Sequence, residues 1–549
     1  MIKFFRHHLL GLLFFIALIA VSIFMRFYNL NWDSGYLFHP DERNIANAVT
    51  KVSFFSQLNP QFFAYGGFSI YVYRFAADML VFFTHDTSWV HNWGDIDIIG
   101  RFFSALFSSL TLIPLYFLTR KVFNRQTAII ATLFYAFSVS AIQIAHFATT
   151  DSLLTCEGVL LGLLGMYLYH AFSWKLLFVS AVVVGISVAT KTSALLFVVF
   201  PVLGTFLPVF HKKNESLKML AALVVFGFIS LAVFTLFSPY TFLDYKDFIA
   251  SMNYESGVAT GSLPVVYTLQ FNGSIPYVFQ LMNFFWQIGL LAPFGVLGVF
   301  LTFYHVWKTR HLQYVVFLSF PLIYFFYVGS WHTKFLRYML PFLPFYVIMA
   351  SAWLIWLQKR VWLFSHLLIG FLLFATTLWA FAFFHIYQVP QTRIVASQWM
   401  YTHIPAGNKI LTEAWDDGLP IGIDNNTPQQ YNIEQLNMYD PDSTAKMQYL
   451  ANELASANYI IFNSRRLYGT LIRLTKEYPL TSQYYKKLFA GTLGYTNIAT
   501  FASYPAISGI TVIDDSSEET FQVYDHPKVI IFENTAHLSQ QQLFAILKK

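Results

Sequence analysis

Long apolar runs, each closed by a short polar segment, fill the first 388 residues of the chain. A helix needs about 20 mostly apolar residues to cross a bilayer. By that measure we expect about eleven membrane-spanning helices, at roughly 8–25, 98–119, 126–145, 152–171, 176–190, 192–210, 219–238, 277–300, 312–330, 338–356 and 362–386. The pattern therefore predicts a polytopic α-helical membrane protein.

The first two spans are separated by a long loop, about residues 26–97. Within it, residues 67–84 are apolar enough to span, but they contain Arg74 and Asp78. If this segment were a span, every later loop would lie on the opposite side of the membrane, and the basic clusters would be outside. We therefore expect residues 67–84, and likewise 42–56, to form amphipathic helices that lie on the outer membrane surface.

The pattern changes near residue 388. From there on, polar and apolar positions alternate over short runs, which is typical of strands. We expect a helix at 392–405 and a surface loop at 416–430, with strands at 409–414, 458–463, 520–526 and 528–534, the last two joined by a turn at Pro527. The chain thus divides into a transmembrane domain, 1–388, and a small α/β domain, 389–549.

Composition supports this division. Of the 549 residues, 56% are hydrophobic and 11% are charged, whereas soluble domains carry about 25% charged residues. Residues 389–549 are about twice as rich in charge as residues 1–388. The single cysteine, Cys156, excludes an internal disulfide and a zinc-finger spacing.

Basic residues give the expected orientation. If the N-terminus is cytoplasmic, the inner loops carry thirteen Lys and Arg residues against one acid, Glu215. Because cytoplasmic loops of membrane proteins are enriched in Lys and Arg, we expect this orientation. With eleven spans, the α/β domain then lies outside the membrane.

The sharpest chemical feature is the run His39-Pro40-Asp41-Glu42 in the first outer loop. Proline fits the first turn of a helix, so Asp41 and Glu42 are expected there too. Two adjacent carboxylates at the membrane surface can act as a general base and its partner toward an acceptor hydroxyl. The alternative, favoured by the local pattern alone, is that both acids only stabilise the helix N-terminus through its dipole.

His146 and Asp151 form a second polar group at the outer end of the third span, and Glu157 follows within the fourth. Asp151 is also a good candidate for capping a helix. An intramembrane carboxylate such as Glu157 is a functional candidate by default. A buried, hydrogen-bonded pair is the alternative.

Three cationic side chains, Arg101, Lys191 and Arg337, are expected near the outer boundary of their spans. Together they could bind the phosphate of a lipid whose head group faces outward. Each alone is better explained as a side chain that extends to the interface. The chain contains no Walker A sequence and no GxGxxG after a strand, so nothing indicates nucleotide chemistry.

Several motifs, in order along the first 345 residues, resemble the GT-C glycosyltransferases, and within them the phospholipid-carrier-dependent branch. That branch includes protein O-mannosyltransferases and the aminoarabinose transferases of lipid A. The motifs are FHPDE at 38–42, GRFFSALFSSLTLIPLYFLTRKVF at 100–123, AHFATTDSLLT at 145–155, GISVATKTSALLFVVFP at 185–201 and LRYMLPFLP at 336–344.

The resemblance implies a membrane glycosyltransferase that moves a sugar from a polyprenyl-phosphate carrier to an extracytoplasmic acceptor by inverting displacement. Asp41 would be the base, with Glu42 beside it. Arg101 resembles a family residue that contacts the carrier phosphate, and Lys191 and Arg337 match recurring basic positions. The alternative is a transporter or flippase of lipid-linked sugars, but the inner halves of the spans lack the polar route that alternating access needs.

The expected partners are a polyprenyl-phosphate-linked sugar donor, an extracytoplasmic acceptor (protein, lipid or glycan) and membrane lipid, with no nucleic acid. The expected location is the prokaryotic plasma (inner) membrane. A divalent metal near His39, Asp41 and Asp151 stays an open alternative. The spacing of these residues gives no recognisable ligand set, so no metal or other cofactor is assigned.

Overall fold

The computed structural model describes residues 2–208 and 216–548, and it divides into two compact units. Unit 1 comprises Met1–Ala259 and Ile275–Phe384, and unit 2 comprises Thr260–Ser274 and His385–Lys549. The segment Thr260–Ser274 is therefore part of unit 2, although it lies between membrane segments in the sequence. The local sequence gives no sign of this division.

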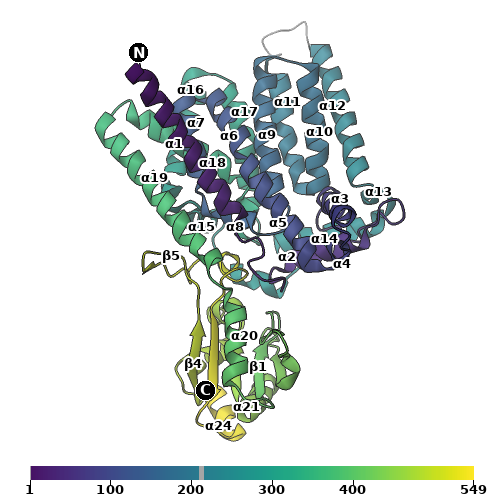
Figure 1. Cartoon of the computed structure of the whole chain (residues 1–549), viewed down its shortest axis with the longest axis vertical. Coiled ribbons are helices and arrows are strands. Elements are labelled where there is room, and N and C mark those ends of the chain that lie inside the picture. Colours follow the sequence, from purple (N-terminus) through teal and green to yellow (C-terminus); the bar gives the residue numbers. More distant parts are fainter. Residues whose placement is uncertain (1, 209–215, 549) are drawn as a thin grey trace. The chain divides into compact units, whose positions relative to one another are not determined.

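Unit 1 is a bundle of long, apolar helices (Figure 1). A helix of the bundle falls within or across every segment in which a span is predicted: α1 (Ile2–Phe27), α5 (Trp93–Leu110), α6 (Leu112–Val122), α7 (Arg125–Ala136), α8 (Val139–Ala145), α9 (Asp151–His170), α10 (Trp174–Thr190), α11 (Val199–Phe206), α12 (Ser216–Phe237), α15 (Val278–Ile288), α16 (Ala292–Thr309), α17 (Gln313–Gly329), α18 (Leu343–Gln358) and α19 (Trp362–Phe384).

Length and hydropathy identify this unit as membrane-integral. Among the described residues, five helices are long and apolar enough to cross a membrane, and α7 with α8 would make a sixth as one span bent by 52°. Five shorter apolar helices also lie in predicted spans: Gly11–Phe27, Trp174–Thr190, Thr192–Phe206, Gln313–Gly329 and Leu343–Gln358. Whether all eleven segments cross the bilayer stays a prediction.

Five further helices gather at one end of the bundle, the end at which α1 finishes (Figure 1). They are α2 (Pro40–Lys51), α3 (Gly67–Thr84), α4 (Ser88–His91), α13 (Tyr240–Leu243) and α14 (Tyr245–Thr260). The two helices predicted in the first loop are thus present as α2 and α3. In α3 the charges that argued against a span, Arg74 and Asp78, pair with each other at 3.0 Å.

An apolar core fixes α2 and α3 to the start of α5. Ile45 and Val49 lie one turn apart on α2 and are buried together with Ile70 and Tyr73 of α3 and Ile96 of α5. Residues four apart on a helix share a face, which explains why α2 turns one side inward along its whole length. The N-terminus of α2 is therefore held in place by packing.

Unit 2 contains a five-stranded mixed sheet in the order β2-β1-β3-β7-β4, flanked by helices. The strands are β1 (Lys409–Glu413), β2 (Asn432–Leu436), β3 (Tyr459–Phe462), β4 (Tyr495–Phe501) and β7 (Val529–Asn534), with a small separate pair, β5 (Ala506–Ile507) and β6 (Ile510–Thr511). The helices are α20 (Thr392–His403), α21 (Thr444–Ser456), α22 (Arg466–Leu471), α23 (Pro479–Phe489) and α24 (Gln540–Leu547).

One predicted strand is wrong. Residues 520–526 form no strand and no hairpin with β7, which instead pairs antiparallel with β3 and β4. The polar side chains of this stretch bind elsewhere: His526 lies between Asp514 at 2.7 Å and Asp525 at 2.5 Å, all buried. The stretch begins in a short 3-10 helix, η9 (Glu519–Phe521), continues in a turn and is buried at every position, so its alternation does not mark the two faces of a strand.

Candidate active site

The site begins at the N-terminus of α2. His39 caps the helix, with its Nδ1 accepting a hydrogen bond from the Asp41 backbone at 3.2 Å, and its ring packs on Phe147. Pro40, Asp41 and Glu42 occupy the first turn, as predicted. Successive helical residues point about 100° apart. The two neighbouring acids therefore enter different environments.

Glu42 enters a buried ion cluster with Arg101 and Asp33. Arg101 Nε and Nη2 donate to the two Glu42 oxygens at 2.8 and 2.7 Å, and Nη1 and Nη2 donate to the two Asp33 oxygens at 2.8 and 2.7 Å. The remaining Nη1 hydrogen goes to the Leu30 carbonyl oxygen at 2.9 Å, and Glu42 also accepts from the Ala148 backbone. All three charged side chains are at most 1% exposed.

This geometry differs from the role that the resemblance implied for Arg101. A guanidinium has five N–H donors, and all five of Arg101 are bound within the protein. None remains for a lipid phosphate. Arg101 instead ties the start of α2 to α5 through Glu42, so both residues hold Asp41 in position. Asp33, which completes the cluster, has no recognisable sequence signal.

Asp41 enters a second, partly open cluster. Its Oδ2 lies 2.8 Å from Arg337 Nη2, and the side chains of Asp41 and Arg337 are 19% and 10% exposed. Lys191, at the C-terminal end of α10, pairs with Asp151 at 3.4 Å. Lys191 is 19% exposed, whereas Asp151 is 1% exposed. Two of the three predicted cations, Lys191 and Arg337, are thus placed with two of the predicted acids.

Aromatic side chains frame this cluster. The Lys191 ammonium lies over the rings of Tyr65 and Tyr338, at 5.3 and 5.4 Å from their centroids. The Arg337 guanidinium lies over Tyr338 at 5.7 Å and over Phe335 at 5.0 Å. Cations are attracted to aromatic faces by the ring quadrupole, so these rings help to hold both side chains in place. Neither tyrosine is a candidate site residue from the sequence.

Asp41 is held as a carboxylate. Burial by itself would raise its pKa, but the Arg337 guanidinium opposes that effect most strongly. Lys191 adds a favourable charge interaction, and the Tyr65 hydroxyl donates a hydrogen bond to the carboxylate. The balance lowers the pKa of Asp41 below its usual value. In this state Asp41 is charged but weakly basic.

A third acid, Glu255 of α14, faces the same charges. Burial raises its pKa, Lys191 lowers it, and the nearby Asp41 raises it again, so that the pKa of Glu255 ends above its usual value. Glu255 was not a candidate from the sequence because it lies in an ordinary amphipathic stretch. Only the fold brings α14 to the end of the bundle that carries α2 (Figure 1).

The loop that carries Tyr65 is seated tightly on α10. Gly66 donates its N–H to the Thr190 carbonyl oxygen at 3.0 Å. A Cβ on Gly66 would lie 1.9 Å from the Ala189 carbonyl oxygen, so only glycine fits. Because Thr190 directly precedes Lys191, this contact places Tyr65 beside the Lys191 ammonium.

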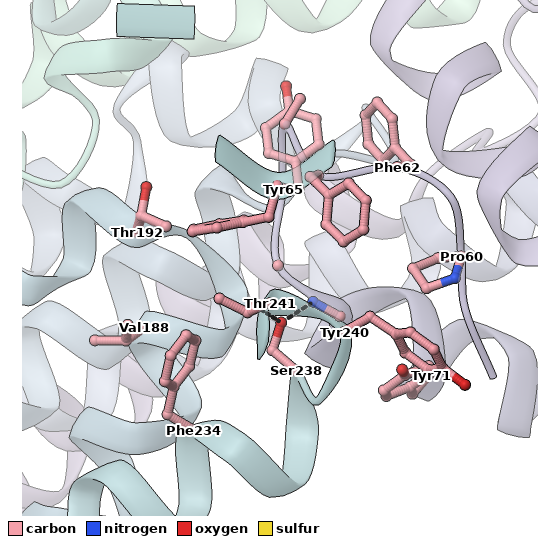
Figure 2. A pocket seen from close by; sticks show the side chains of 15 residues that line it. Pro60, Phe62, Tyr65, Tyr71, Val188, Thr192, Phe234, Ser238, Tyr240 and Thr241 are labelled. Carbon is pink, nitrogen blue, oxygen red and sulfur yellow. Dashed lines mark hydrogen bonds between the residues drawn. The ribbon is translucent and has the colours of Figure 1, made fainter. Parts of the chain in front are cut away.

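The next residue of the loop is tied to α13. Gly67 N–H donates to Ser238 Oγ at 3.3 Å, and Ser238 also bonds to Thr241 at 3.0 Å (Figure 2). Figure 2 shows these groups below a small recess, with Tyr65, Phe62 and Pro60 from the loop above it. The recess has a volume of about 10 Å³, enough for roughly one water. The loop is therefore packed, with Gly-Gly as its sequence signal.

The remaining predicted residues, His146, Glu157 and Asp151, each contact other parts of the protein. The ring nitrogens of His146 lie 2.8 and 3.0 Å from the carbonyl oxygens of Ile142 and Tyr28. His146 thus joins the end of α8 to the chain after α1 and lies outside the Asp41 cluster. Glu157 accepts a hydrogen bond from Thr190 at 3.3 Å. Asp151 starts α9, and its Oδ2 accepts no hydrogen bond from the described residues.

Within residues 2–208 and 216–548, no group of three or more His, Cys, Asp or Glu side chains has an arrangement that could hold a metal ion. His39 uses Nδ1 for its own helix, and Asp151 faces Lys191. The arrangement as it stands combines a carboxylate, two cations and a tyrosine hydroxyl at one partly open position. That set can accept a proton and stabilise an anion.

A comparison with family models identifies residues 93–240 as a match to the family described as dolichyl-phosphate-mannose-protein mannosyltransferase. The matched region runs from α5 to α13 and includes Arg101, Asp151 and Lys191. No curated protein matches the chain in sequence. The match confirms the resemblance to carrier-dependent GT-C glycosyltransferases and favours an enzyme over a transporter.

Solved structures to which this chain shows a distant likeness include three glycosyltransferases. The archaeal oligosaccharyltransferase AglB from Archaeoglobus fulgidus, with an inhibitory peptide and a dolichol-phosphate, is 14% identical over 86% of this chain and 72% of its own, with a TM-score of 0.48. ArnT from Cupriavidus metallidurans, bound to undecaprenyl phosphate, is 13% identical over 96% and 99%, with a TM-score of 0.48. The Pmt1-Pmt2 protein O-mannosyltransferase of S. cerevisiae, bound to the sugar donor, is 14% identical over 43% and 34%, with a TM-score of 0.33.

Proposed function

We propose that this chain, a membrane glycosyltransferase of the GT-C type, takes its sugar from a polyprenyl-phosphate carrier and passes it to an extracytoplasmic acceptor, with Asp41 as the base. One observation carries the proposal: the Asp41 carboxylate is paired with Arg337 at 2.8 Å, beside the second cation, Lys191. A proton acceptor and an anion-binding pair thus lie at the same partly open position.

In the proposed reaction, Asp41 accepts the proton of the acceptor nucleophile as that atom attacks the anomeric carbon of the sugar. The bond from this carbon to the phosphate oxygen breaks, and the carrier leaves as polyprenyl phosphate. Attack from the face opposite the leaving group inverts the configuration. Arg337 and Lys191 stabilise the charge that gathers on the departing phosphate, as a leaving anion requires.

Because Asp41 is paired with Arg337, donor binding precedes activation of the base in this mechanism. While the pair persists, the lowered pKa of Asp41 makes it a poor base. A bound donor phosphate competes for Arg337, and guanidinium groups bind phosphate through two parallel hydrogen bonds. Once Arg337 turns to the phosphate, the basicity of Asp41 rises. The base thus becomes effective only when the donor is in place.

In this scheme Glu42 and Arg101 are positioning residues, and Tyr65 holds both Asp41 and Lys191. His39 fixes the first turn of α2. Asp151 sets the position of Lys191 through their 3.4 Å contact. The proposal therefore transfers the phosphate role that the resemblance gave to Arg101 onto Arg337 and Lys191.

The test is sugar transfer by the full chain in nanodiscs, with a polyprenyl-phosphate-linked sugar as donor. Asp41→Asn should abolish turnover and leave donor binding intact. Asp247→Asn removes an exposed acid from α14 and serves as the matched control. Wild-type turnover in Asp41→Asn would refute Asp41 as the base.

The proposal also includes the arrangement in the membrane. Eleven segments cross the bilayer of a prokaryotic plasma membrane, the N-terminus is cytoplasmic, and residues 389–549 lie outside. A reporter enzyme that is active only in the cytoplasm, fused after Lys549, should then be silent. Strong reporter activity would overturn this arrangement and leave the chemistry of the site to its own test.

A further inference from the structure

Unit 2 carries a small hairpin that is separate from its five-stranded sheet. The strands β5 and β6 pair antiparallel, with Ile507 opposite Ile510. Ser508 and Gly509 join them, both with positive φ, as a two-residue hairpin turn requires. Within unit 2 the hairpin lies at the end opposite α21 and α24 (Figure 1). A two-stranded hairpin by itself is only marginally stable in water, so it needs a surface on which to pack.

The exposed end of this hairpin is apolar. In the described part of unit 2, the two most exposed large hydrophobic side chains are Ile510 and Ile513, at 69% and 65%. No charged residue occurs between Lys487 and Asp514, although residues 389–549 are otherwise rich in charge. Exposed apolar side chains that gather at one place mark contact with a membrane or another protein. The hairpin thus has the character of a contact surface.

The surroundings of the hairpin add no uncompensated charge to this surface. Asp514, which follows Ile513 directly, is 0% exposed and lies 2.7 Å from His526. Asp515 pairs with Lys528 at 3.2 Å. A groove of about 640 Å³ separates the hairpin from the segment that leads into α20, and no Asp, Glu, Lys or Arg side chain lines it. The apolar tip can therefore enter an apolar environment without carrying a bare charge with it.

The covalent connection to α19 fixes the level of the hairpin. β5 lies against η7 (His385–Gln388), and η7 begins directly after the last residue of α19. The 23 residues of α19 measure about 35 Å at 1.5 Å per residue, whereas the hydrocarbon core of a bilayer is about 30 Å thick. If α19 crosses the membrane, η7 starts among the lipid head groups. Its four residues rise by only about 8 Å, so the hairpin stays close to the membrane surface.

We propose that the β5–β6 hairpin is a lipid contact: Ile510 and Ile513 insert into the head-group layer of the outer leaflet and anchor unit 2 to the bilayer surface. The inference rests on the proposed arrangement, in which α19 crosses the membrane and residues 389–549 lie outside. The membrane is the partner because η7 holds the hairpin beside it, and because an apolar tip gains free energy at the interface without a complementary charge.

The test uses the full chain in nanodiscs, with Cys156→Ala and a fluorophore on one introduced cysteine. The fluorophore is attached to Ile510→Cys or, as the control, to Tyr449→Cys, an exposed position on α21 at the opposite end of unit 2 (Figure 1). The nanodisc lipids carry a nitroxide quencher near the head group. Emission at position 510 should be quenched, and emission at position 449 should not. Thermal unfolding of each labelled protein checks that it is folded.

Two outcomes at position 510 would overturn the proposal. Emission typical of water would show that the hairpin reaches no lipid. Emission typical of an apolar environment, but without quenching, would show that protein covers the hairpin, either another part of this chain or a second copy. The cytoplasmic reporter after Lys549 tests the membrane arrangement separately. A silent reporter together with an unquenched label therefore refutes the anchor alone.

A charge at the tip provides a second test. Ile513→Asp, combined with the label at position 510, removes an apolar contact and forces a carboxylate toward the lipid. The ratio of quenched to unquenched label should fall about tenfold, the lower end for the loss of a buried isoleucine side chain. Thr492→Asp adds the same charge at an exposed position before β4, within the same uncharged stretch, and should leave the ratio unchanged. Equal ratios in the two variants would also overturn the proposal.

Discussion

Replacement of Arg101 separates the two roles considered for this residue. Arg101→Gln leaves Asp33 and Glu42 buried together without their shared cation. Removing one partner of a buried ion pair typically costs about 3–5 kcal/mol of stability. Here the loss includes four hydrogen bonds to carboxylates and the contact with the Trp32 ring at 4.8 Å. We therefore expect a marked fall in the unfolding temperature.

The milder variant, Arg101→Lys, keeps the charge but cannot reproduce the planar fork that bonds both acids at once. We expect it to fold with reduced thermal stability. Its turnover should fall because α2 is held less firmly, while the donor concentration at half-maximal rate stays near the wild-type value. Transfer rate against donor concentration, with thermal unfolding in parallel, measures both quantities.

Lys191→Gln provides the contrasting pattern. Its ammonium is partly exposed, but its removal leaves the buried Asp151 carboxylate without this partner, so stability should fall, though less than in Arg101→Gln. Loss of a charged contact to the donor phosphate, about 1.5–3 kcal/mol, should raise the donor concentration at half-maximal rate ~10- to 150-fold. If Arg101→Lys instead has normal thermal stability and a raised donor concentration at half-maximal rate, the structural role of Arg101 is refuted. Arg101 would then be a phosphate ligand.

Three further predictions follow from the geometry. Tyr65→Phe removes a hydrogen bond that lowers the pKa of Asp41, so the acid limb of the pH–rate profile should move to higher pH. Gly66→Ala forces a Cβ against the Ala189 carbonyl oxygen, and turnover should fall further than in Tyr65→Phe without loss of folded protein. His526 has its pKa raised to about 10 from 6.5, because two aspartates outweigh the cost of burial; the stability it gives is complete below pH 6.5 and is lost as the pH rises through 10. His526→Gln should remove that pH dependence from thermal unfolding.

The helices of unit 1 could be predicted because a single physical requirement decides where they lie. Membrane segments must be long and apolar, and the helices of unit 1 fall where such runs occur. The placement of Thr260–Ser274 in unit 2 depends on long-range packing, for example of Val266 and Leu269 against the apolar core there. No local composition signals that choice. The strand expected at 520–526 is wrong for a similar reason: long-range contacts, such as that of His526 with Asp514, decide the structure of this stretch.

The site was predictable in its residue types but not in its pairings. Spacing along the chain gave the acids of α2 and the basic residues, because polar groups in an apolar chain are few and costly. It could not tell which cation meets which acid. Asp33 lies in an unremarkable loop, yet it takes two N–H donors of Arg101. That single contact decides between a ligand for phosphate and a structural residue.

The two adjacent acids of α2 have different surroundings because successive residues of a helix point in different directions. Glu42 is fully enclosed and bonded on both oxygens, so it fixes the helix but has no access to a substrate. Asp41 is partly open, and its partner Arg337 is also partly open. An ion pair between partly exposed side chains is more easily exchanged than one between fully enclosed side chains. The two acids, one step apart in sequence, thus give the site one enclosed contact and one partly exposed contact, and in the proposed mechanism a donor phosphate replaces the second.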